Sequence, residues 1–275
     1  MNILKISRPR FWLYELGTYA IGVAAGFLFL QELDLLNILI FGFYFLFPAN
    51  LLIYGINDIF DYETDKLNPK KNSYEELVDP EQHKKIYKQI LLFNIPFIVY
   101  GLFVLNFETF IWLFLFLFFA TFYSAKPIRA KTKPFLDSFF SAGHYIATGI
   151  FGYILIGGDS IPWTALIAGM LWAISMHAYS AIPDITSDLS SGIKTIATKF
   201  GIRNTIVLCT FFYISAFVLA GTYLGLWAYV LLTPYLAFMF ISYKAETEEK
   251  IFKVYKYFPI LNALVGMTVF FFAAL

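Results

Sequence analysis

The chain has 275 residues, of which 59% are apolar and only 14% are charged. That charged fraction is about half of what a soluble globular domain carries, so too few polar residues remain to coat a soluble body. The mean hydropathy of +0.68 excludes a disordered chain, a nucleic-acid-binding module and most soluble enzymes. A net charge of +1 says little about partners. The composition therefore indicates a protein that crosses a membrane many times.

The apolar segments of the chain fit the length of a bilayer-spanning helix, which needs about 20 mostly apolar residues. We predict nine spans, at residues 11–31, 36–56, 86–105, 108–123, 135–156, 162–182, 204–223, 225–243 and 256–274. Because only helices satisfy their own backbone in lipid at this composition, we predict an all-α bundle around a central chamber. No soluble second domain is visible, so residues 1–275 are expected to form a single transmembrane domain.

The basic residues orient these predicted spans. All 20 Lys and Arg residues precede the first span or follow the second, fourth, sixth and eighth spans. The opposite turns, at 31–35, 105–109, 157–161 and 221–226, contain none. By the positive-inside rule, we expect the N-terminus and the long loops in the cytoplasm and the C-terminus outside. The expected location is the cell membrane of a prokaryote.

A helix start is visible in the loop before the third span. The sequence Asp79-Pro80-Glu81-Gln82 combines an N-cap, a proline suited to the first turn and a glutamine at the capping-box position. We expect a cytoplasmic helix to begin here and to continue into the membrane.

Acidic residues gather at the cytoplasmic end of the second span, which reads Asn57-Asp58-Ile59-Phe60-Asp61-Tyr62-Glu63-Thr64-Asp65. If the helix continues, Asp61 and Asp65 lie about 60° and about 20° around its axis from Asp58. Three carboxylates would then share one narrow face. Glu63 points about 140° away and is expected to be a bystander.

A second acidic pair, Asp184 and Asp188, lies one helical turn apart at the end of the sixth span. Like charges at this spacing repel, and no Lys or Arg follows either cluster at a spacing that would pair each acid. Carboxylate and amide oxygens without His or Cys suit Mg²⁺, which also binds substrate phosphates. The alternative is that the acids are exposed or paired with basic loops. The predicted metal ligands are Asn57, Asp58, Asp61, Asp65, Asp184 and Asp188.

Positive charge lies on the same predicted face of the membrane as the acids. The segment Tyr123–Lys131 leaves the fourth span there, and Lys194 follows the second acidic pair. A departing diphosphate needs cationic charge besides the metal ions, and we expect Arg129, Lys131 and Lys194 to supply it. For Lys133, positive-inside topology is an equally good explanation.

Ionisation of an allylic prenyl diphosphate is the reaction that needs this arrangement. The C–O bond breaks to give a resonance-stabilised carbocation, which aromatic faces stabilise and an apolar chamber shields from water. Asn50 and Tyr54 on the second span, and His177 and Ser180 on the sixth, lie one or two turns below the acids. We expect these four residues to line the chamber, although His177 could equally be a packing residue.

Glu15 is an acid inside the first predicted span. Membrane proteins keep acids away from lipid unless they use them. The sequence leaves two roles open for Glu15, which are pairing with another helix and facing the chamber.

The two acidic motifs, their separation and the nine-span layout resemble the UbiA superfamily of intramembrane prenyltransferases over essentially the whole chain. Asn57–Asp65 fits the first family motif, NDxxDxxxD, at every position, and Asp184 with Asp188 fits the second, DxxxD. Tyr123 and the basic residues up to Lys131 look like the basic loop of the family. The resemblance implies that the acids bind Mg²⁺ and that the loop and Asn57 bind diphosphate. The residues that it implies for catalysis are Asp58, Asp61, Asp184, Asp188 and Lys194.

A narrower likeness is to the lycopene elongase branch of this superfamily. It is carried by the segments 7–14 (SRPRFWLY), 177–184 (HAYSAIPD) and 192–198 (GIKTIAT). The resemblance implies transfer of C5 units from dimethylallyl diphosphate to the end of lycopene, as in the biosynthesis of C50 carotenoids of the bacterioruberin type. It also implies that some members hydrate the neighbouring carbon.

Two other functions remain open from the sequence. The first keeps the chemistry but changes the acceptor to a quinone precursor, a porphyrin-type alcohol, a (bacterio)chlorophyllide or a glycerophosphate lipid. No basic residue lies away from the span ends to anchor an acidic acceptor, which favours an apolar one. The second is a transporter or cation channel, which predicts polar residues throughout the membrane depth rather than at helix ends. The expected partners are a prenyl diphosphate, a lipid-soluble acceptor and the bilayer, without nucleic acid.

Overall fold

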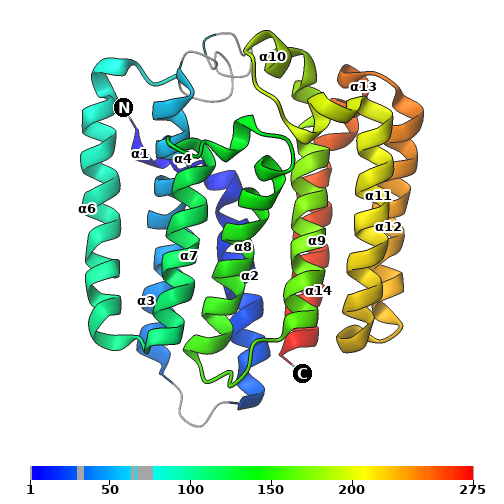
Figure 1. Ribbon diagram of the computed structural model, residues 1–275. Helices are drawn as coiled ribbons and strands as arrows, with labels where there is room; N and C mark the ends of the chain where they lie inside the picture. The colour runs from blue at the N-terminus through cyan, green and yellow to red at the C-terminus, as the bar shows by residue number, and fades with distance from the viewer. Residues whose placement is uncertain (1, 30–33, 63–65, 67–76, 275) are drawn as a thin grey trace. The chain divides into compact units, whose positions relative to one another are not determined.

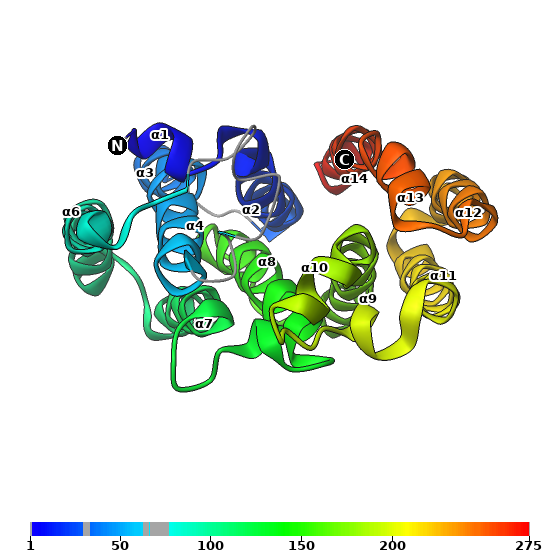
Figure 2. The same cartoon turned by 90° about the horizontal axis from the view of Figure 1, so that it is seen from above.

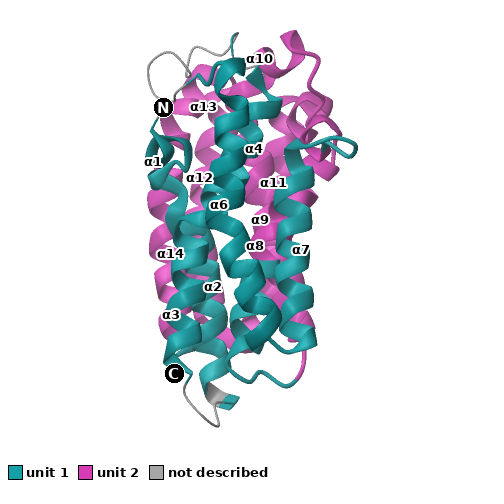
Figure 3. Cartoon of the chain, turned by 90° about the vertical axis from the view of Figure 1, so that its left-hand side faces the viewer, with its two compact units in different colours: residues 1–129, 147–159, 273–275 teal, residues 130–146, 160–272 magenta. Residues whose placement is uncertain are grey.

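The structure is a computed structural model that describes residues 2–29, 34–62, 66 and 77–274. All regular secondary structure in these residues is helical, as predicted. The chain divides into two compact units, shown in different colours in Figure 3. Unit 1 comprises residues 1–129, 147–159 and 273–275, and unit 2 comprises residues 130–146 and 160–272.

Unit 1 contains the helices of the N-terminal half. They are α1 (Ile3–Ile6), η1 (Pro9–Phe11), α2 (Trp12–Gly26), η2 (Phe27–Phe29), α3 (Leu35–Leu46), α4 (Pro48–Phe60), α6 (Pro80–Val104) and α7 (Phe107–Ser124). Helix α4 packs against α6, α7 and the short α1 (Figure 2). The end of α4, the start of α6 and the end of α7 lie at one end of this unit, together with α1 (Figure 1). The first acidic motif is at this end, because α4 leads into it.

Unit 2 contains the remaining helices. They are η4 (Ala130–Thr132), α9 (Trp163–Ser180), η5 (Ile182–Asp184), α10 (Ile185–Ser190), α11 (Ile196–Leu224), α12 (Trp227–Ala245), α13 (Glu248–Tyr255) and α14 (Phe258–Ala273). Helix α11 packs against both α9 and α12, and α13 packs against η5. Helix α8 (Leu136–Leu155) begins in unit 2 and ends in unit 1.

The predicted helix start before the third span is present. Helix α6 begins at Pro80, with Asp79 as an extended N-cap residue. Proline is suited to this position because it lacks an N–H that the first turn could not use and because its fixed φ is already helical.

The predicted span at 36–56 is broken into α3 and α4. Pro48 is the first residue of α4, and Phe47 before it has non-helical angles (φ −121°, ψ −60°). A proline interrupts the helical hydrogen bonds and leaves carbonyl groups exposed. The side-chain amide of Asn50 donates to the carbonyls of Phe45 and Leu46, each at 3.0 Å. Asn94 of α6 donates to the carbonyl of Pro48 at 3.1 Å, so buried side-chain amides supply hydrogen bonds to the backbone around the break.

Small residues allow α2 and the second half of α8 to approach closely within unit 1. A Cβ atom at Gly22 would collide with the carbonyl oxygen of Gly149, and a Cβ at Gly152 would lie 2.5 Å from the carbonyl oxygen of Tyr19. Glycine contacts of this kind let membrane helices associate through their backbones. The aromatic core of unit 1 surrounds this contact, with Tyr19, Phe45 and Phe151 packed ring against ring.

Unit 2 is held together by buried polar contacts between its helices. The Trp172 indole N–H donates to the Tyr235 hydroxyl at 2.9 Å, and Tyr235 donates to Asn262 at 3.0 Å. The Ser175 hydroxyl donates to the carbonyl of Cys209 at 2.8 Å. Interhelical hydrogen bonds contribute to membrane bundles because lipid offers no competing partner. These contacts link α9 to α11 and α12, and α12 to α14.

Seven helical stretches among the described residues are long and apolar enough to cross a membrane. They are Leu35–Phe60, Pro80–Val104, Phe107–Ser124, Trp163–Ser190, Ile196–Leu224, Trp227–Ala245 and Glu248–Ala273. Helix α2 falls short because 3₁₀ turns flank it and leave 15 residues in the α-helix. Helix α8 has 20 residues but carries serine, threonine and histidine residues that lower its mean hydropathy. The chain is a multispanning membrane protein, and the count of nine stays a prediction.

Candidate functional site

The first acidic motif lies where α4 ends, and this end differs from the predicted continuous helix. Helix α4 stops at Phe60, and Asp61 is its C-cap residue (φ −106°, ψ 2°). Asp58 therefore lies in the last turn of the helix, whereas Asp61 lies just beyond it. The expectation of a single helical face cannot be followed to Asp65, which lies outside the described residues. Asp58 and Asp61 are both buried, with 4% and 1% of their surface exposed.

Asp58 forms an ion pair with Arg8, which the sequence analysis did not place in the site. The Nη2 atom of Arg8 lies 2.8 Å from Oδ1 of Asp58. The side chains are 15% and 5% exposed, so this pair is largely withdrawn from solvent. Arg8 comes from the N-terminal segment, fifty positions before Asp58. The expectation that the acids lack basic partners is thus wrong for Asp58, because local spacing says nothing of a partner so far away in sequence.

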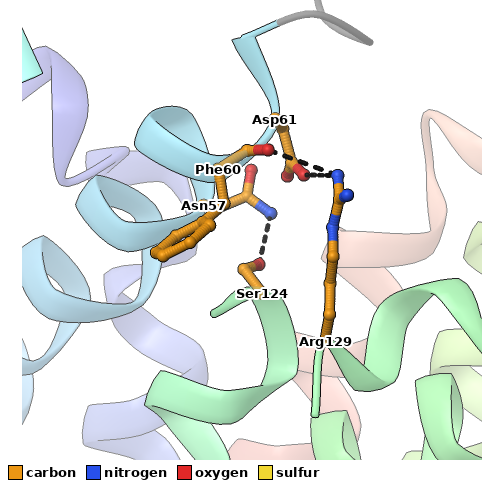
Figure 4. Close-up of polar contacts among 5 residues, drawn as sticks. All are labelled: Asn57, Phe60, Asp61, Ser124 and Arg129. Atoms are coloured by element: carbon orange, nitrogen blue, oxygen red, sulfur yellow. Dashed lines mark hydrogen bonds and ion pairs between the residues drawn. The ribbon is translucent and has the colours of Figure 1, made fainter. Parts of the chain in front are cut away.

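Asp61 is bonded to Arg129, which the sequence did predict for the site. The Nη2 atom of Arg129 donates to the carbonyl of Phe60 at 3.2 Å and to Oδ1 of Asp61 at 3.4 Å (Figure 4). Arg129 lies in the loop after α7 and has a left-handed backbone (φ 44°). The guanidinium thus contacts the end of α4 at two points, where it also complements the negative helix C-terminus. Asp61 has a basic partner too, which corrects the same expectation.

Asn57 connects the motif to the end of α7. Its side-chain amide donates to the hydroxyl of Ser124 at 3.1 Å (Figure 4). Ser124 is fully buried, and the neighbouring Tyr123 is half-buried. Because the amide nitrogen is used in this bond, the carbonyl oxygen of Asn57 is the atom that could bind a cation. The start of the basic loop is thereby fixed next to the first motif.

The second acidic motif lies on η5 and α10 in unit 2. Asp184 ends the 3₁₀ turn and Asp188 lies in the first turn of α10, and both are half-buried. Thr186, between them, donates from its hydroxyl to Oε1 of Glu248 at 2.6 Å, and its backbone N–H donates to the other carboxylate oxygen at 3.3 Å. Glu248, in the first turn of α13, therefore holds this motif in place. No sequence pattern singled out Glu248, because its partner lies sixty-two positions away.

The other predicted cationic residues belong to unit 2. Lys131 is half-buried on η4, and Lys194 is exposed in the turn between α10 and α11. The structure thus brings Arg129 to the first motif within unit 1. Lys194 lies in the same unit as the second motif.

The predicted chamber residues lie on α4 and α9. Asn50 is buried, and its amide nitrogen bonds the α3–α4 break as described above. The Tyr54 ring contacts the Arg8 guanidinium at 4.7 Å and the Phe11 ring at 5.7 Å. His177 and Ser180 occupy the last turn of α9, where Ser180 donates to the His177 carbonyl at 2.7 Å. Because α9 ends at Ser180 and Asp184 belongs to a 3₁₀ turn, the predicted shared face with Asp184 is not a regular helical one.

Glu15 pairs with another helix, which is one of the two roles that the sequence left open. The Thr148 hydroxyl of α8 donates to Oε2 of Glu15 at 2.9 Å, and both residues are buried in unit 1. This acid is therefore part of a buried polar pair beside the aromatic core of unit 1.

The first motif offers only oxygen ligands. The carboxylates of Asp58 and Asp61 with the carbonyl oxygen of Asn57 form a donor set that suits Mg²⁺ rather than a softer metal. Within the described ranges, no three His, Cys, Asp or Glu side chains gather closely enough to hold a metal ion by themselves. Mg²⁺ usually keeps waters or substrate phosphates beside its protein ligands, and the oxygen donors of this motif suit that kind of binding.

Comparison with known proteins identifies the family. The family model for UbiA prenyltransferases matches residues 17–258. The lycopene elongase/hydratase of Haloferax volcanii is 37% identical over 268 residues, which cover 96% of this chain and 85% of that protein. The lycopene elongase/hydratase of Haloarcula japonica is 37% identical over 271 residues, covering 96% and 88%.

The fold agrees with this assignment. A UbiA homolog from Archaeoglobus fulgidus has been solved bound to GPP and Mg²⁺ and bound to DMAPP and Mg²⁺. These structures match with TM-scores of 0.70 and 0.66 at 19% identity, covering 98% of this chain and 99% of theirs. At this identity, the likeness concerns the fold alone.

Proposed function

Because this chain belongs to the UbiA prenyltransferase family, and so is an enzyme that transfers prenyl groups, we propose that it elongates lycopene or a related carotenoid. The donor is dimethylallyl diphosphate, and the reaction depends on Mg²⁺. The acceptor is supported by the 37% identity to two lycopene elongase/hydratases over 96% of the chain. The donor and the metal are supported by the homolog of the same fold that binds DMAPP and Mg²⁺.

Both acidic motifs bind the metal–diphosphate group in this proposal. The ligands are Asn57, Asp58, Asp61, Asp65, Asp184 and Asp188. Bound Mg²⁺ supplies Lewis acidity that weakens the C–O bond of the donor. The support from this chain is the oxygen-only donor set at the end of α4, where the carboxylates of Asp58 and Asp61 lie close together in sequence with the side-chain carbonyl of Asn57.

The basic residues bind the diphosphate and stabilise its charge as it departs. Arg129 presents a planar fork beside the first motif. The set is completed by Asn57, Tyr123, Lys131 and Lys194. Arg129 is supported by its bonds to Phe60 and Asp61, which place a guanidinium beside the proposed metal ligands. Charge-assisted bonds to phosphate are among the strongest that a side chain can make.

The aromatic chamber then controls what happens to the carbocation. The C–O bond breaks toward the diphosphate, a C–C bond forms with the terminal alkene of the acceptor, and the new cation loses a proton or adds water. Tyr54 lies one turn before Asp58 on α4 and presents a π face to the cation. Asn50, His177 and Ser180 line the same chamber, where His177 handles a proton.

The proposal also covers the arrangement of the chain in the membrane. Both units belong to a single domain with nine spans, in the cell membrane of a prokaryote, with the N-terminus cytoplasmic and the C-terminus outside. The family match from 17 to 258 spans residues of both units, which supports one domain. Within unit 1, α1 and the end of α7 lie at the same end of the unit (Figure 1). Basic residues lie in or next to both segments, which supports a cytoplasmic location for this end.

Expression in a host that accumulates lycopene tests the proposed function. We expect new pigments whose masses exceed that of lycopene by whole C₅H₈ units, with or without the mass of water. The matched control is the Asp184→Asn variant in the same host, which should leave lycopene unchanged. Unchanged lycopene in cells that contain correctly inserted wild-type protein would show that the acceptor is different.

A further inference from the structure

The N-terminal segment is anchored against α4 on both sides of Arg8. Ile6 is 1% exposed and belongs to the core of unit 1, and Ser7 is fully buried. After Arg8, the indole N–H of Trp12 donates back to the carbonyl of Ser7 at 3.0 Å. The segment therefore forms a closed turn around Arg8.

Arg8 has a strained backbone within this turn. Its φ of 50° and ψ of 73° lie in the left-handed region, which residues other than glycine rarely adopt. Such a conformation is unfavourable for a residue with a side chain and persists only where surrounding contacts determine it. Arg129, which bonds Asp61, also has a positive φ of 44°. The two arginines that contact the first motif are thus both presented by left-handed turns.

The Arg8 side chain contacts two positions on α4 that are one turn apart. Its guanidinium lies 2.8 Å from the carboxylate of Asp58 and 4.7 Å from the centre of the Tyr54 ring. Residues four apart share a helix face, so a single guanidinium covers both side chains. With 15% of the Arg8 side chain exposed, most of its charge is withdrawn from water. The pair compensates a buried charge at Asp58 that would otherwise be costly.

A guanidinium at Asp58 occupies the same carboxylate that the proposed function assigns to a metal ion. A metal ion and the guanidinium would be two positive charges on one carboxylate, so they repel each other and binding of the metal ion weakens the Arg8–Asp58 pair. A diphosphate offers a displaced guanidinium the planar pairs of oxygens that it binds best. Arg8 therefore has a second partner available when the metal and the donor arrive together.

We propose that Arg8 is a donor-binding residue that exchanges partners, pairing with Asp58 before the donor arrives and with its diphosphate afterwards. This inference rests on the proposed function, because it assumes a metal–diphosphate site at Asp58. The exchange adds the N-terminal segment to the donor site. It also implies that Mg²⁺ binds weakly in the absence of the donor, because Arg8 is then still paired with Asp58. Binding of metal and diphosphate should therefore be cooperative.

Calorimetric titration of the full-length protein in nanodiscs tests this exchange. One titration uses Mg²⁺ alone, and the second uses inorganic diphosphate at saturating Mg²⁺. For Arg8→Gln, we expect Mg²⁺ alone to bind about tenfold more tightly and diphosphate about tenfold more weakly, as the loss of one charge-assisted bond implies. The control Lys5→Gln removes an equal charge from the exposed face of the same segment and should change neither affinity.

Only this pair of opposite shifts supports the exchange. Equal losses in both affinities would mean that Arg8 is structural, and an unchanged diphosphate affinity would remove it from the donor site. If Arg8→Gln does not fold, Arg8→Lys decides, because it keeps the charge without the fork. It should weaken diphosphate binding about threefold or more and leave Mg²⁺ binding unchanged, and equal diphosphate affinity would overturn the proposal. A wild-type protein that binds no Mg²⁺–diphosphate would instead contradict the proposed function.

Discussion

The two acidic motifs have similar sequences but are held in place by different contacts. In unit 1, Asp58 and Asp61 are buried, and each carboxylate is bonded by an arginine from a distant segment. In unit 2, Asp184 and Asp188 are half-buried, and the motif is held through Thr186, whose hydroxyl and N–H both bond Glu248. Charge compensation at the first motif is thus direct. At the second motif, the neutral residue Thr186 makes the hydrogen bonds to Glu248 that hold the motif in place.

This difference predicts that removing an acid has separate effects on activity and stability. Asp58→Asn and Asp184→Asn should each lower turnover by more than about a hundredfold, because each removes a proposed metal ligand. Asp58→Asn leaves the mostly buried guanidinium of Arg8 without its charge partner, so it should lower the free energy of unfolding by roughly 2 kcal/mol. Turnover with labelled donor and thermal unfolding in detergent measure the two effects. An Asp58→Asn variant as stable as the wild type would contradict the role of the Arg8–Asp58 pair in stability.

The geometry of the guanidinium at the first motif can be tested without changing the charge. Arg129→Lys keeps the positive-inside signal but cannot bond Phe60 and Asp61 with one planar group. We expect turnover to fall about tenfold to a hundredfold while the protein inserts normally. Lys194→Gln should weaken donor binding in the same sense at the second motif. Lys133→Gln is the control. Equal small effects at all three positions would mean that these basic residues only set the orientation of the chain in the membrane.

Anchoring of the second motif by Glu248 should have a smaller effect. Glu248→Gln weakens the bonds to Thr186 without touching Asp184 or Asp188, so turnover should fall about threefold to tenfold. The KM for the donor should rise more than kcat falls, because the motif is displaced rather than removed. The control is Glu249→Gln, which changes a neighbouring exposed acid that pairs only along its own helix with Lys253. A change at Glu249 as large as that at Glu248 would argue against the anchoring role.

The smallest effect is expected at the buried polar pair of the unit 1 core. A double-mutant cycle of Glu15→Gln and Thr148→Val should give a coupling free energy of about 0.6 kcal/mol, typical of hydrogen bonds between membrane helices. Unfolding of the four proteins in the same detergent measures it. A coupling free energy of several kcal/mol would contradict this expectation, because it would make the Glu15–Thr148 bond a major contribution to the stability of unit 1.

The sequence predicted those features that depend on local pattern. The described parts of the predicted spans are largely helical, with the span at 36–56 broken at Phe47, because apolar length is a local property of the sequence. The start of α6 at Pro80 was predicted for the same reason, since its signal lies within four residues. Family motifs likewise identified Arg129, which the structure places at Asp61.

Features that depend on distant partners could not be predicted. Arg8 and Glu248 contact the motifs from fifty and sixty-two positions away, and neither stands out by spacing. The end of α4 at Phe60 was also missed, because the arginine that bonds its last carbonyl comes from another loop. Positive φ at Arg8 and Arg129 has no signal in residue type, since arginine is not favoured in the left-handed region. Tertiary contacts determine these conformations.

The amides at the α3–α4 break have a consequence for biogenesis. A bilayer-inserted segment is selected for apolar residues, so Asn50→Leu should favour insertion of the unassembled helix. The folded protein needs the opposite, because the Asn50 amide bonds the Phe45 and Leu46 carbonyls that Pro48 leaves open. A substitution that favours insertion of this segment by the translocation machinery would therefore destabilise the folded helical bundle. At position 50, membrane insertion favours an apolar residue, whereas the folded protein needs an amide.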